Sequence, residues 1–561
     1  MAVPSCPVLL LTTCEKPGLG GRVIPLPQGR LLGGSSGLNG QTLVAPSQTG
    51  IDAWAKIGNK GWDWESLRGY YRKFYTLNLP DDEIKKHLGL TWVDENVRGE
   101  SGPIQVSFTG SMDNPMPKAW NETFQKLGLD TSADPFTGNS IGAYANMQTV
   151  DPKTKTRSYS ANAYAAPAMS RQNFKIIYGA EVQRIVLDKP ASSEEEATAT
   201  GVEYLSGEGQ VQFIKAQQEV IVASGVFQSP KLLELSGIGG KDILSKHGIE
   251  TIVDNPNVGE RMQDHLMTGI SFEVVDGIPT ADPLMRREPA ALKAAQEAYA
   301  TTKSGPLTVG GIGSHAYLPL QDASNPSLKN QFQTDFLAKL ETSSNPHEQA
   351  VRDILQKGDD GSGALFLFQA QGVTHENEAT AEHGPVLQDG NFFSFGCIQT
   401  HPLSTGSSHI SSKDASAKPA IDPKYFSNPL DIELMARHLL FCLEVQKREP
   451  LSNCFVPNGR RNHAKAFIQD IDDAKQYLRD TAKTTYHCCG TCSMRPKDQG
   501  GVVDDQLRVY GTKNLRVVDA SIFPFIPRGN IMSTVYAVAE KAADLIKASW
   551  AVFDSYDRDD M

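Results

Sequence analysis

The segment from Tyr486 to Met494, YHCCGTCSM, contains the residue best suited to acid–base chemistry. His487 stands on a glycine-containing loop, and an imidazole with an ordinary pKa of about 6.5 is partly neutral near pH 7. His487 is therefore a candidate general base. Cys489 and Cys492 form the only CxxC pair of the chain. Zinc needs about four ligands, and a thioredoxin-like site needs its own small βαβ unit, so we expect neither a metal site nor a redox pair here.

Three other segments could hold a ligand. The run from Gly29 to Gly40, GRLLGGSSGLNG, lets the backbone approach a flat or anionic molecule closely, although composition alone favours an ordinary surface loop. The turn Ala223-Ser224-Gly225 could offer backbone N–H groups, and a plain α/β packing unit explains it equally well. The C-terminal segment ends a strand at Asp519 and brings Asn530 to the start of a helix, where partial positive charge stabilises an anion.

Apolar periodicity predicts two strand–turn–helix units that position these segments. In the first unit, VQFIKA and EVIVASG, which begin at Val211 and Glu219, are strands, and SPKLLELSG is a helix. Ser229 is the expected N-cap of that helix, Pro230 lies in its first turn and Gly237 stops it.

The second unit is C-terminal. NLRVVDAS reads as a buried strand, and STVYAVAEKAADLIKASW reads as a helix that begins just after Asn530, with Ser533 or Thr534 as its cap. Elsewhere, MRREPAALKAAQEAYATTKSG predicts a helix with an exposed face that ends near Gly305. The acidic run from Ser192 to Glu196 is most simply a solvated hairpin loop.

Length and charge narrow the class of protein. The chain has 561 residues, more than the roughly 100–200 of a single domain, so two large or interleaved domains are expected. The net charge is −11 and no long basic stretch stands out, so nucleic acid is not an expected partner. No apolar run reaches the roughly 18–20 residues that cross a bilayer, and we expect no membrane span. We find no signal peptide pattern, which leaves the compartment open with a leaning to the cytoplasm.

Five motifs, taken in order, closely resemble those of the glucose-methanol-choline (GMC) family of flavin oxidoreductases. They are GRLLGGSSGLNG, ASGVFQSPKLLELSGIG, NVGERMQDH (Asn257 to His265), HCCGTCSM and NLRVVDASIFPFIPRGNIMSTVYAVAEKAADLI. The resemblance implies an α/β fold, α+β overall. In it an N-terminally truncated, Rossmann-like FAD/NAD(P)-binding domain (residues 1–60, 171–280 and 481–561) is interleaved with an α+β substrate-binding domain (residues 61–170 and 281–480).

The resemblance also implies a reaction. A CH–OH group of a small or medium organic alcohol would be oxidised to a carbonyl by hydride transfer to flavin N5. An alcohol O–H is too weak an acid to ionise alone near pH 7, so a base must take its proton. His487 matches the family's catalytic histidine. Asn530 matches the second active-site position, where it would orient the substrate oxygen and cannot titrate. The helix near Ser533 would face the N1–C2=O edge of the flavin. The electron acceptor, oxygen or another, stays open.

Cofactor contacts carry over by position. The glycine-rich run would line the isoalloxazine and pyrophosphate, the backbone of Val182 would meet the adenine, and Asp519 would meet the ribityl-pyrophosphate region. The full set is Gly34, Ser35, Asn39, Gly40, Thr42, Val182, Asp519, Ala520 and Asn530. Some relatives attach FAD covalently through a histidine in the first motif. Because this chain has Leu38 at that point, we expect noncovalent FAD.

The sequence departs from the family at its start. Neither the GxGxxG strand–turn–helix nor the second strand with its acidic end is present, and Gly18-Leu19-Gly20-Gly21 does not match the fingerprint. Either the gene model is incomplete, which the retained His487 and Asn530 favour, or the fold has degenerated and lost tight FAD binding.

A nonredox lyase on the same fold is the alternative activity. Phe392, Phe393, Phe395 and His401 are candidates for the substrate pocket, although a Phe cluster is more often simple core.

Overall fold

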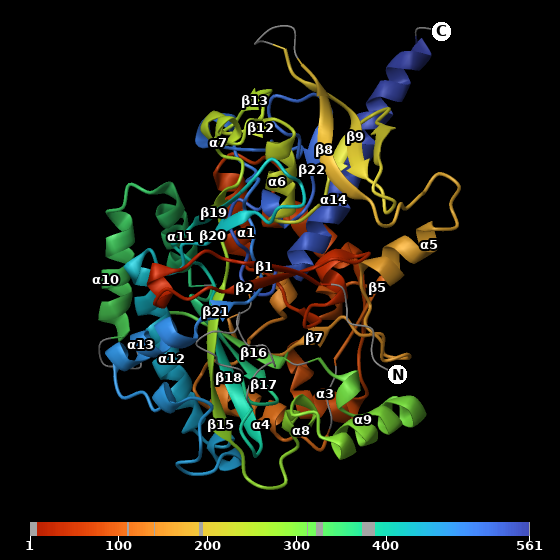
Figure 1. The fold of residues 1–561 in the computed structure, drawn as a ribbon. Helices are drawn as coiled ribbons and strands as arrows, with labels where there is room; N and C mark the ends of the chain where they lie inside the picture. The colour runs from red at the N-terminus through yellow and green to blue at the C-terminus, as the bar shows by residue number, and fades with distance from the viewer. Residues whose placement is uncertain are drawn as a thin grey trace.

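The structure is a computed structural model that describes residues 8–108, 112–139, 141–189, 195–310, 312–320, 329–358, 360–372 and 387–559. Helices and strands alternate irregularly along the chain (Figure 1). The α-helices are α1 (Gln48–Lys56), α2 (Trp64–Lys73), α3 (Asp82–Leu88), α4 (Met116–Lys126), α5 (Ala166–Ala168), α6 (Gln228–Leu235), α7 (Lys241–Lys246), α8 (Asp282–Met285), α9 (Pro289–Thr302), α10 (Lys329–Glu341), α11 (Pro346–Gln356), α12 (Pro429–Gln446), α13 (Ile471–Thr481) and α14 (Met532–Asp559).

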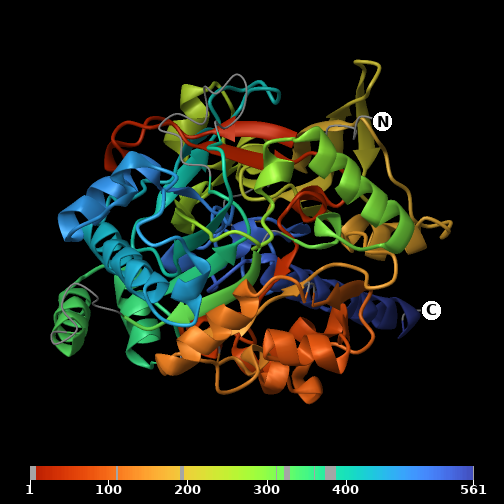
Figure 2. The ribbon, with the colours of Figure 1, turned by 90° about the horizontal axis from the view of Figure 1, so that it is seen from below.

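A six-stranded antiparallel sheet forms one half of the molecule, in the lower part of Figure 1. Its order is β21 (Lys483–Thr484), β15 (Leu266–Glu273), β18 (Phe392–Gln399), β17 (Gly363–Phe368), β16 (Ile312–Leu318) and β6 (Gly142–Ala145). Helix α12 packs on β17 and β18, and α13 packs on α12; both are blue in Figure 2. Phe393 and Phe395 are fully buried in the cluster between these elements, and Phe392 is fully buried beside them, so these side chains belong to the core.

A short parallel pair, β11 (Val220–Val222) and β22 (Leu515–Val517), lies in the other half. Beside it an antiparallel sheet has the order β10 (Val211–Lys215), β9 (Thr198–Leu205) and β8 (Glu181–Asp188), and α6 packs on β8. These strands lie next to α14 in the upper part of Figure 1. The predicted strands at VQFIKA, EVIVASG and NLRVVDAS are therefore confirmed, as is the helix that ends before Gly305, which is α9. Residues 192–194 of the predicted hairpin loop lie outside the described residues.

The predicted N-caps were wrong, whereas Gly237 does end the first helix: it follows the C-cap residue Ser236 and has a φ of 84°. Helix α6 begins at Gln228 with Phe227 as its N-cap residue, and the Ser229 hydroxyl instead donates a hydrogen bond to Asp519 at 2.5 Å. Helix α14 begins at Met532, so Ser533 and Thr534 lie inside it and cannot be its caps. The Ser533 hydroxyl donates to the Val44 carbonyl at 2.6 Å, which ties the helix start to the N-terminal part of the chain.

Shorter sheets complete the fold. They are β1 (Val8–Thr12) with β2 (Pro25–Gly29); β3 (Thr42–Leu43), β7 (Met147–Gln148), β5 (Ile104–Ser107) and β4 (Tyr75–Asn78); β12 (Ile238–Gly239) with β13 (Val253–Asp254); and β14 (Glu260–Met262), β19 (Gly406–His409) and β20 (Ala420–Asp422).

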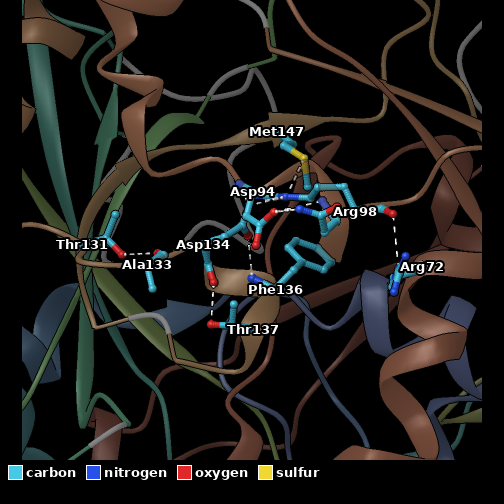
Figure 3. A network of polar contacts seen from close by, with 10 residues as sticks. Arg72, Asp94, Arg98, Thr131, Ala133, Asp134, Phe136, Thr137 and Met147 are labelled. Carbon is cyan, nitrogen blue, oxygen red and sulfur yellow. Dashed lines mark hydrogen bonds and ion pairs between the residues drawn. The ribbon is translucent and has the colours of Figure 1, made fainter.

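The sheet that contains β3 is braced by a buried ion pair, drawn in Figure 3. The Arg98 Nε lies 2.7 Å from the Asp134 Oδ2, and an Arg98 Nη1 lies 3.0 Å from the Met147 sulfur.

Two large hydrophobic clusters correspond to the two halves. One holds the strands of the parallel pair together with α1, α2 and α14, and the other holds the six-stranded sheet with α4, α12 and α13. Within the described part of the chain, no helix is both long and apolar enough to cross a bilayer.

Candidate functional site

His487 lies in the loop after β21, at the boundary between the two halves. Its side chain is buried, with 7 % of its surface exposed. The backbone N–H of His487 donates to the Asp264 Oδ1 at 3.1 Å. The residue before it, Tyr486, has a φ of 64°, which is uncommon for a residue other than glycine. The loop is thus held in a specific conformation that directs the imidazole inward.

Asn530 meets His487 from the other side. Its Nδ2 lies 3.2 Å from the Nε2 of His487, so the structure brings together the two residues that were predicted to be catalytic. Its Oδ1 is buried and has no partner among the described residues. Gly529 makes this approach possible. It has a φ of 81°, and a Cβ there would lie 2.5 Å from the Tyr317 hydroxyl oxygen.

The segment that ends the NVGERMQDH motif runs alongside the His487 loop. Gln263 and Cys489 exchange two backbone hydrogen bonds of 3.0 and 2.9 Å, and the Thr485 N–H donates to the His265 carbonyl at 2.9 Å. This pairing places the His265 ring against the His487 ring, with 3.0 Å between their Nδ1 atoms. His265 and Asp264 were missed as site residues, although the motif that contains them was noticed in the sequence.

Burial determines the charge of this centre. Removal from water lowers the pKa of His487 to about 3. Burial, with help from the neighbouring His487 and His401, lowers the pKa of His265 well below its usual value. Both rings are therefore neutral at pH 7. A neutral imidazole has a lone pair to offer, which is the form that a general base requires.

The glycine-rich run reaches the same place through Asn39. The Asn39 Nδ2 donates to the sulfur of Met532 at 3.0 Å, and its Oδ1 accepts from Arg157 at 2.7 Å. Gly34 and Ser35 lie in a 3-10 helix over Gly34–Gly37, and the Ser35 hydroxyl accepts the Gly29 N–H at 3.1 Å. The Asn39 contact joins this run to the first residue of α14, two positions after Asn530.

The remaining predicted cofactor residues lie farther along the same half. Thr42 is buried on β3 and Gly40 is exposed just before it. Val182 lies on β8 with 39 % of its surface exposed, so it is not a buried core valine. Ala520 is half-buried, and its carbonyl accepts the Gly490 N–H at 3.1 Å.

Asp519 is engaged within the protein. One of its carboxylate oxygens accepts the Gly225 N–H at 2.9 Å and the Ser229 hydroxyl. The Ser224 N–H bonds to the Ser229 Oγ at 3.1 Å. Two N–H groups of the turn Ala223-Ser224-Gly225 are thus already satisfied, and the turn offers a ligand less than the sequence suggested.

Several features of this surface fit a large planar cofactor. A Cβ built on Gly34 or Gly40 would meet no atom within 4 Å, so both glycines border open space. The first N–H groups of α14 have no partners inside the helix, which makes its start favourable for partial negative charge. The orphaned Oδ1 of Asn530 lies beside that start. Gly40, which follows Asn39, therefore lies near the start of α14 and the unsatisfied amide of Asn530, because Asn39 contacts Met532.

A polar wall adjoins His487 and Asn530 from the six-stranded sheet. His315 and Tyr317 lie two positions apart on β16, with ring planes 8° apart, and neither the His315 Nε2 nor the Tyr317 hydroxyl has a partner in the described part of the chain. Arg528 is buried with its guanidinium 4.7 Å from the centre of the Tyr317 ring. Burial raises the pKa of Asp360, but His401 and Arg528 together lower it to about 2, so Asp360 balances the charge of Arg528.

Two other features do not belong to this centre. An open hollow of about 300 Å³ beside Gly33 has an almost wholly apolar lining that contains neither His487 nor Asn530. Cys489 and Cys492 are free thiols, both buried. No group of three His, Cys, Asp or Glu side chains among the described residues could hold a metal ion.

Comparison with known proteins identifies the family. The GMC oxidoreductase family models match residues 9–267 and 402–539. The chain is 34% identical to a dehydrogenase of Monascus purpureus over 549 residues, which cover 94% of this chain and 85% of that protein. It is 32% identical to a GMC oxidoreductase family protein of Malassezia sympodialis over 538 residues, which cover 93% of this chain and 79% of that protein.

Solved structures agree. An FAD-dependent oxidoreductase from Chaetomium thermophilum matches with a TM-score of 0.83 and 25% identity, covering 96% of this chain and 90% of the other. Formate oxidase from Aspergillus oryzae matches with a TM-score of 0.80 and 26% identity, covering 97% and 88%. The predicted α/β architecture, a Rossmann-like FAD domain with a substrate-binding domain, is confirmed by these neighbours. The chain belongs to the GMC oxidoreductase family and is an FAD-dependent oxidoreductase.

Proposed function

We propose that this protein oxidises the CH–OH group of a small or medium organic alcohol to a carbonyl, with His487 as the base and Asn530 as the group that orients the substrate oxygen. The observation that carries the proposal is the 3.2 Å contact between the His487 Nε2 and the Asn530 Nδ2 at the start of α14. A neutral base and an uncharged donor converge there, at the helix start that Asn39 of the glycine-rich run also contacts.

The two side chains divide the work on the substrate oxygen. The His487 Nε2 takes the hydroxyl proton, because burial keeps this ring neutral and a neutral imidazole has a lone pair that can accept it. The Asn530 amide donates a hydrogen bond to the same oxygen and holds it next to Nε2. Bound FAD supplies the two-electron acceptor for the oxidation. Loss of the hydroxyl proton and of a hydride from the carbinol carbon leaves the carbonyl product.

FAD would be held noncovalently by residues from both ends of the chain. Gly34, Ser35, Asn39, Gly40 and Thr42 would line the ring system and pyrophosphate, since Asn39 already contacts the first residue of α14. Asp519, Ala520 and Val182 would lie along the ribityl and adenosine portions. The Leu38 side chain carries no nucleophile, so it offers no point for covalent attachment. We also propose that the FAD-binding domain comprises residues 1–60, 171–280 and 481–561, and that the substrate-binding domain comprises residues 61–170 and 281–480.

Anaerobic rapid mixing of the FAD-loaded protein with primary alcohols tests the roles of the two residues. His487→Gln should lower the rate of flavin bleaching by about 100-fold or more, because general base catalysis typically contributes that much. Asn530→Ala should lower it less, by about 10-fold, since one hydrogen bond to a developing charge is lost. The FAD content of His487→Gln should equal that of the wild type. A His487→Gln variant that bleaches at the wild-type rate would remove His487 from the role of base.

A further inference from the structure

His265 lies directly behind His487, on the side away from Asn530. Its side chain is fully buried, and the two rings meet edge to face at 87°. One ring nitrogen, Nδ1, lies 3.0 Å from the Nδ1 of His487. The other, Nε2, lies 2.9 Å from the backbone carbonyl oxygen of Thr400. Both nitrogens of this ring are thus in hydrogen-bonded contacts with fixed protein groups.

The Thr400 carbonyl determines where the hydrogen of His265 sits. A carbonyl oxygen can only accept, so the His265 Nε2 must carry a hydrogen and donate it. Because burial keeps His265 neutral, the ring has one hydrogen only. Its Nδ1 is therefore a lone pair that accepts a hydrogen bond.

The same reasoning then places the hydrogen of His487. Two ring nitrogens 3.0 Å apart need one donor between them, and the Nδ1 of His265 is an acceptor. The donor is therefore the Nδ1–H of His487. Since His487 is also neutral, its Nε2 holds a lone pair, which accepts from the Asn530 amide at 3.2 Å. Each hydrogen bond in this row runs in one direction, from Asn530 through His487 and His265 to Thr400.

The opposite tautomer of His487 would break two contacts at once. Its Nδ1 lone pair would face the lone pair of His265, and its Nε2–H would face the N–H₂ of Asn530. The backbone pairing of residues 263–265 with 485–489 prevents the rings from moving apart to relieve this conflict. A hydrogen on Nε2 would also leave His487 unable to take a proton at the atom beside Asn530.

We propose that His265 is a positioning residue, which holds His487 in the tautomer with its hydrogen on Nδ1 and so presents Nε2 as the proton acceptor. This proposal rests on the proposed role of His487 as the base. His265 is the final residue of the NVGERMQDH motif, and the motif alone does not reveal this positioning role.

The tautomer itself can be observed without turnover. In FAD-loaded protein labelled with 15N at its histidine rings, the His487 resonances are those missing from a His487→Gln variant. We expect Nδ1 to show the shift and one-bond coupling of a protonated nitrogen and Nε2 to show those of a lone-pair nitrogen. A wild-type spectrum with the hydrogen on Nε2 would overturn the proposal whatever the activity.

A matched pair of variants then tests the cause. In His265→Asn the amide oxygen takes the place of Nδ1 and can still accept from His487. In His265→Gln the amide reaches Thr400 but leaves no acceptor at the Nδ1 position. We expect His265→Gln to lose about 10-fold or more of the anaerobic reduction rate, because an imidazole freed from its orienting partner populates the wrong tautomer. We expect His265→Asn to stay within about 3-fold of the wild type.

The readouts separate this inference from the proposed function. If both variants keep FAD and the same urea midpoint but lose the same rate, His265 acts through packing and the positioning role is refuted. If the 15N spectrum shows the hydrogen on Nδ1 while His487→Gln reduces flavin normally, the tautomer is as inferred but the assignment of His487 as base fails. Equal tautomer populations in wild type and His265→Gln would also refute the role of His265.

Discussion

Five buried histidines should make the protein unstable in mild acid. Burial lowers the pKa of His315 and His487 to about 3 and that of His347 and His438 to about 4. It also lowers the pKa of His265 well below its usual value. In the unfolded chain a histidine has a pKa of about 6.5. Between pH 7 and pH 5 the unfolded chain therefore binds protons at these sites and the folded protein does not. These histidines therefore lower the free energy of unfolding as the pH falls through this window.

The size of the effect follows from these pKa values. From pH 7 to pH 5 the four histidines with a folded pKa of about 3 or 4 cost about 1.9 kcal/mol each and roughly 7.5 kcal/mol together, which is comparable to the whole stability of many domains. His409 opposes this loss. Burial disfavours its charged form, but hydrogen bonds to Glu234 and Glu260 raise its pKa to about 9. Its stabilisation is complete below pH 6.5 and is lost as the pH rises through 9, so it gains less than about 1 kcal/mol over the same window.

Urea unfolding at pH 7 and pH 5, with FAD at the same excess, measures the difference. The buried Trp54, Trp62 and Trp120 report unfolding by fluorescence. We expect a much lower urea midpoint at pH 5. His438→Gln should reduce the difference by about 2 kcal/mol, since one proton-binding site of the unfolded chain is gone. His409→Gln is the control of opposite sign and should enlarge it slightly. Equal midpoints at the two pH values in the wild type would refute the reasoning.

Two further predictions concern buried polar groups. Asp134→Ala should lower the free energy of unfolding by about 3–5 kcal/mol, because it leaves the buried Arg98 without a counter-charge. In urea unfolding, the double variant with Arg98→Met should recover part of this loss. A double variant as unstable as the single one would contradict the ion-pair explanation. Tyr317→Phe should leave the urea midpoint unchanged or higher, since the Tyr317 hydroxyl has no partner among the described residues. If that hydroxyl binds substrate, the variant should raise the KM for the best alcohol by about 3- to 10-fold. An unchanged KM would exclude this contact.

Sequence patterns predicted the local elements well. The runs that begin at Val211, Glu219 and Asn514 form strands where expected, because their β-branched residues favour that conformation, even in β10, where every residue is exposed. The final helix starts two residues after Asn530, close to its predicted start. The caps failed because Ser229 is used by Asp519, which lies 290 positions away in the sequence, and no local pattern reveals such a partner.

The site was predicted in part. The sequence motifs indicated His487 and Asn530, and the structure brings them into contact. His265 could not be predicted because its role depends on cross-strand pairing of two segments 222 residues apart. The polar wall of His315 and Tyr317 also depends on which face of β16 is turned toward Asn530. Both contacts depend on how strands and loops pair in the folded protein, which the spacing of residues along the chain does not show.

The most direct test of the central claim is an anaerobic titration of the FAD-loaded protein with a series of primary and secondary alcohols. The account predicts that one alcohol or more bleaches the flavin completely and yields one equivalent of carbonyl product per flavin, and that oxygen or an added acceptor then restores the colour. Product formation without any bleaching would instead indicate a lyase. FAD-loaded protein that neither bleaches nor forms product with any alcohol would contradict the proposed oxidation.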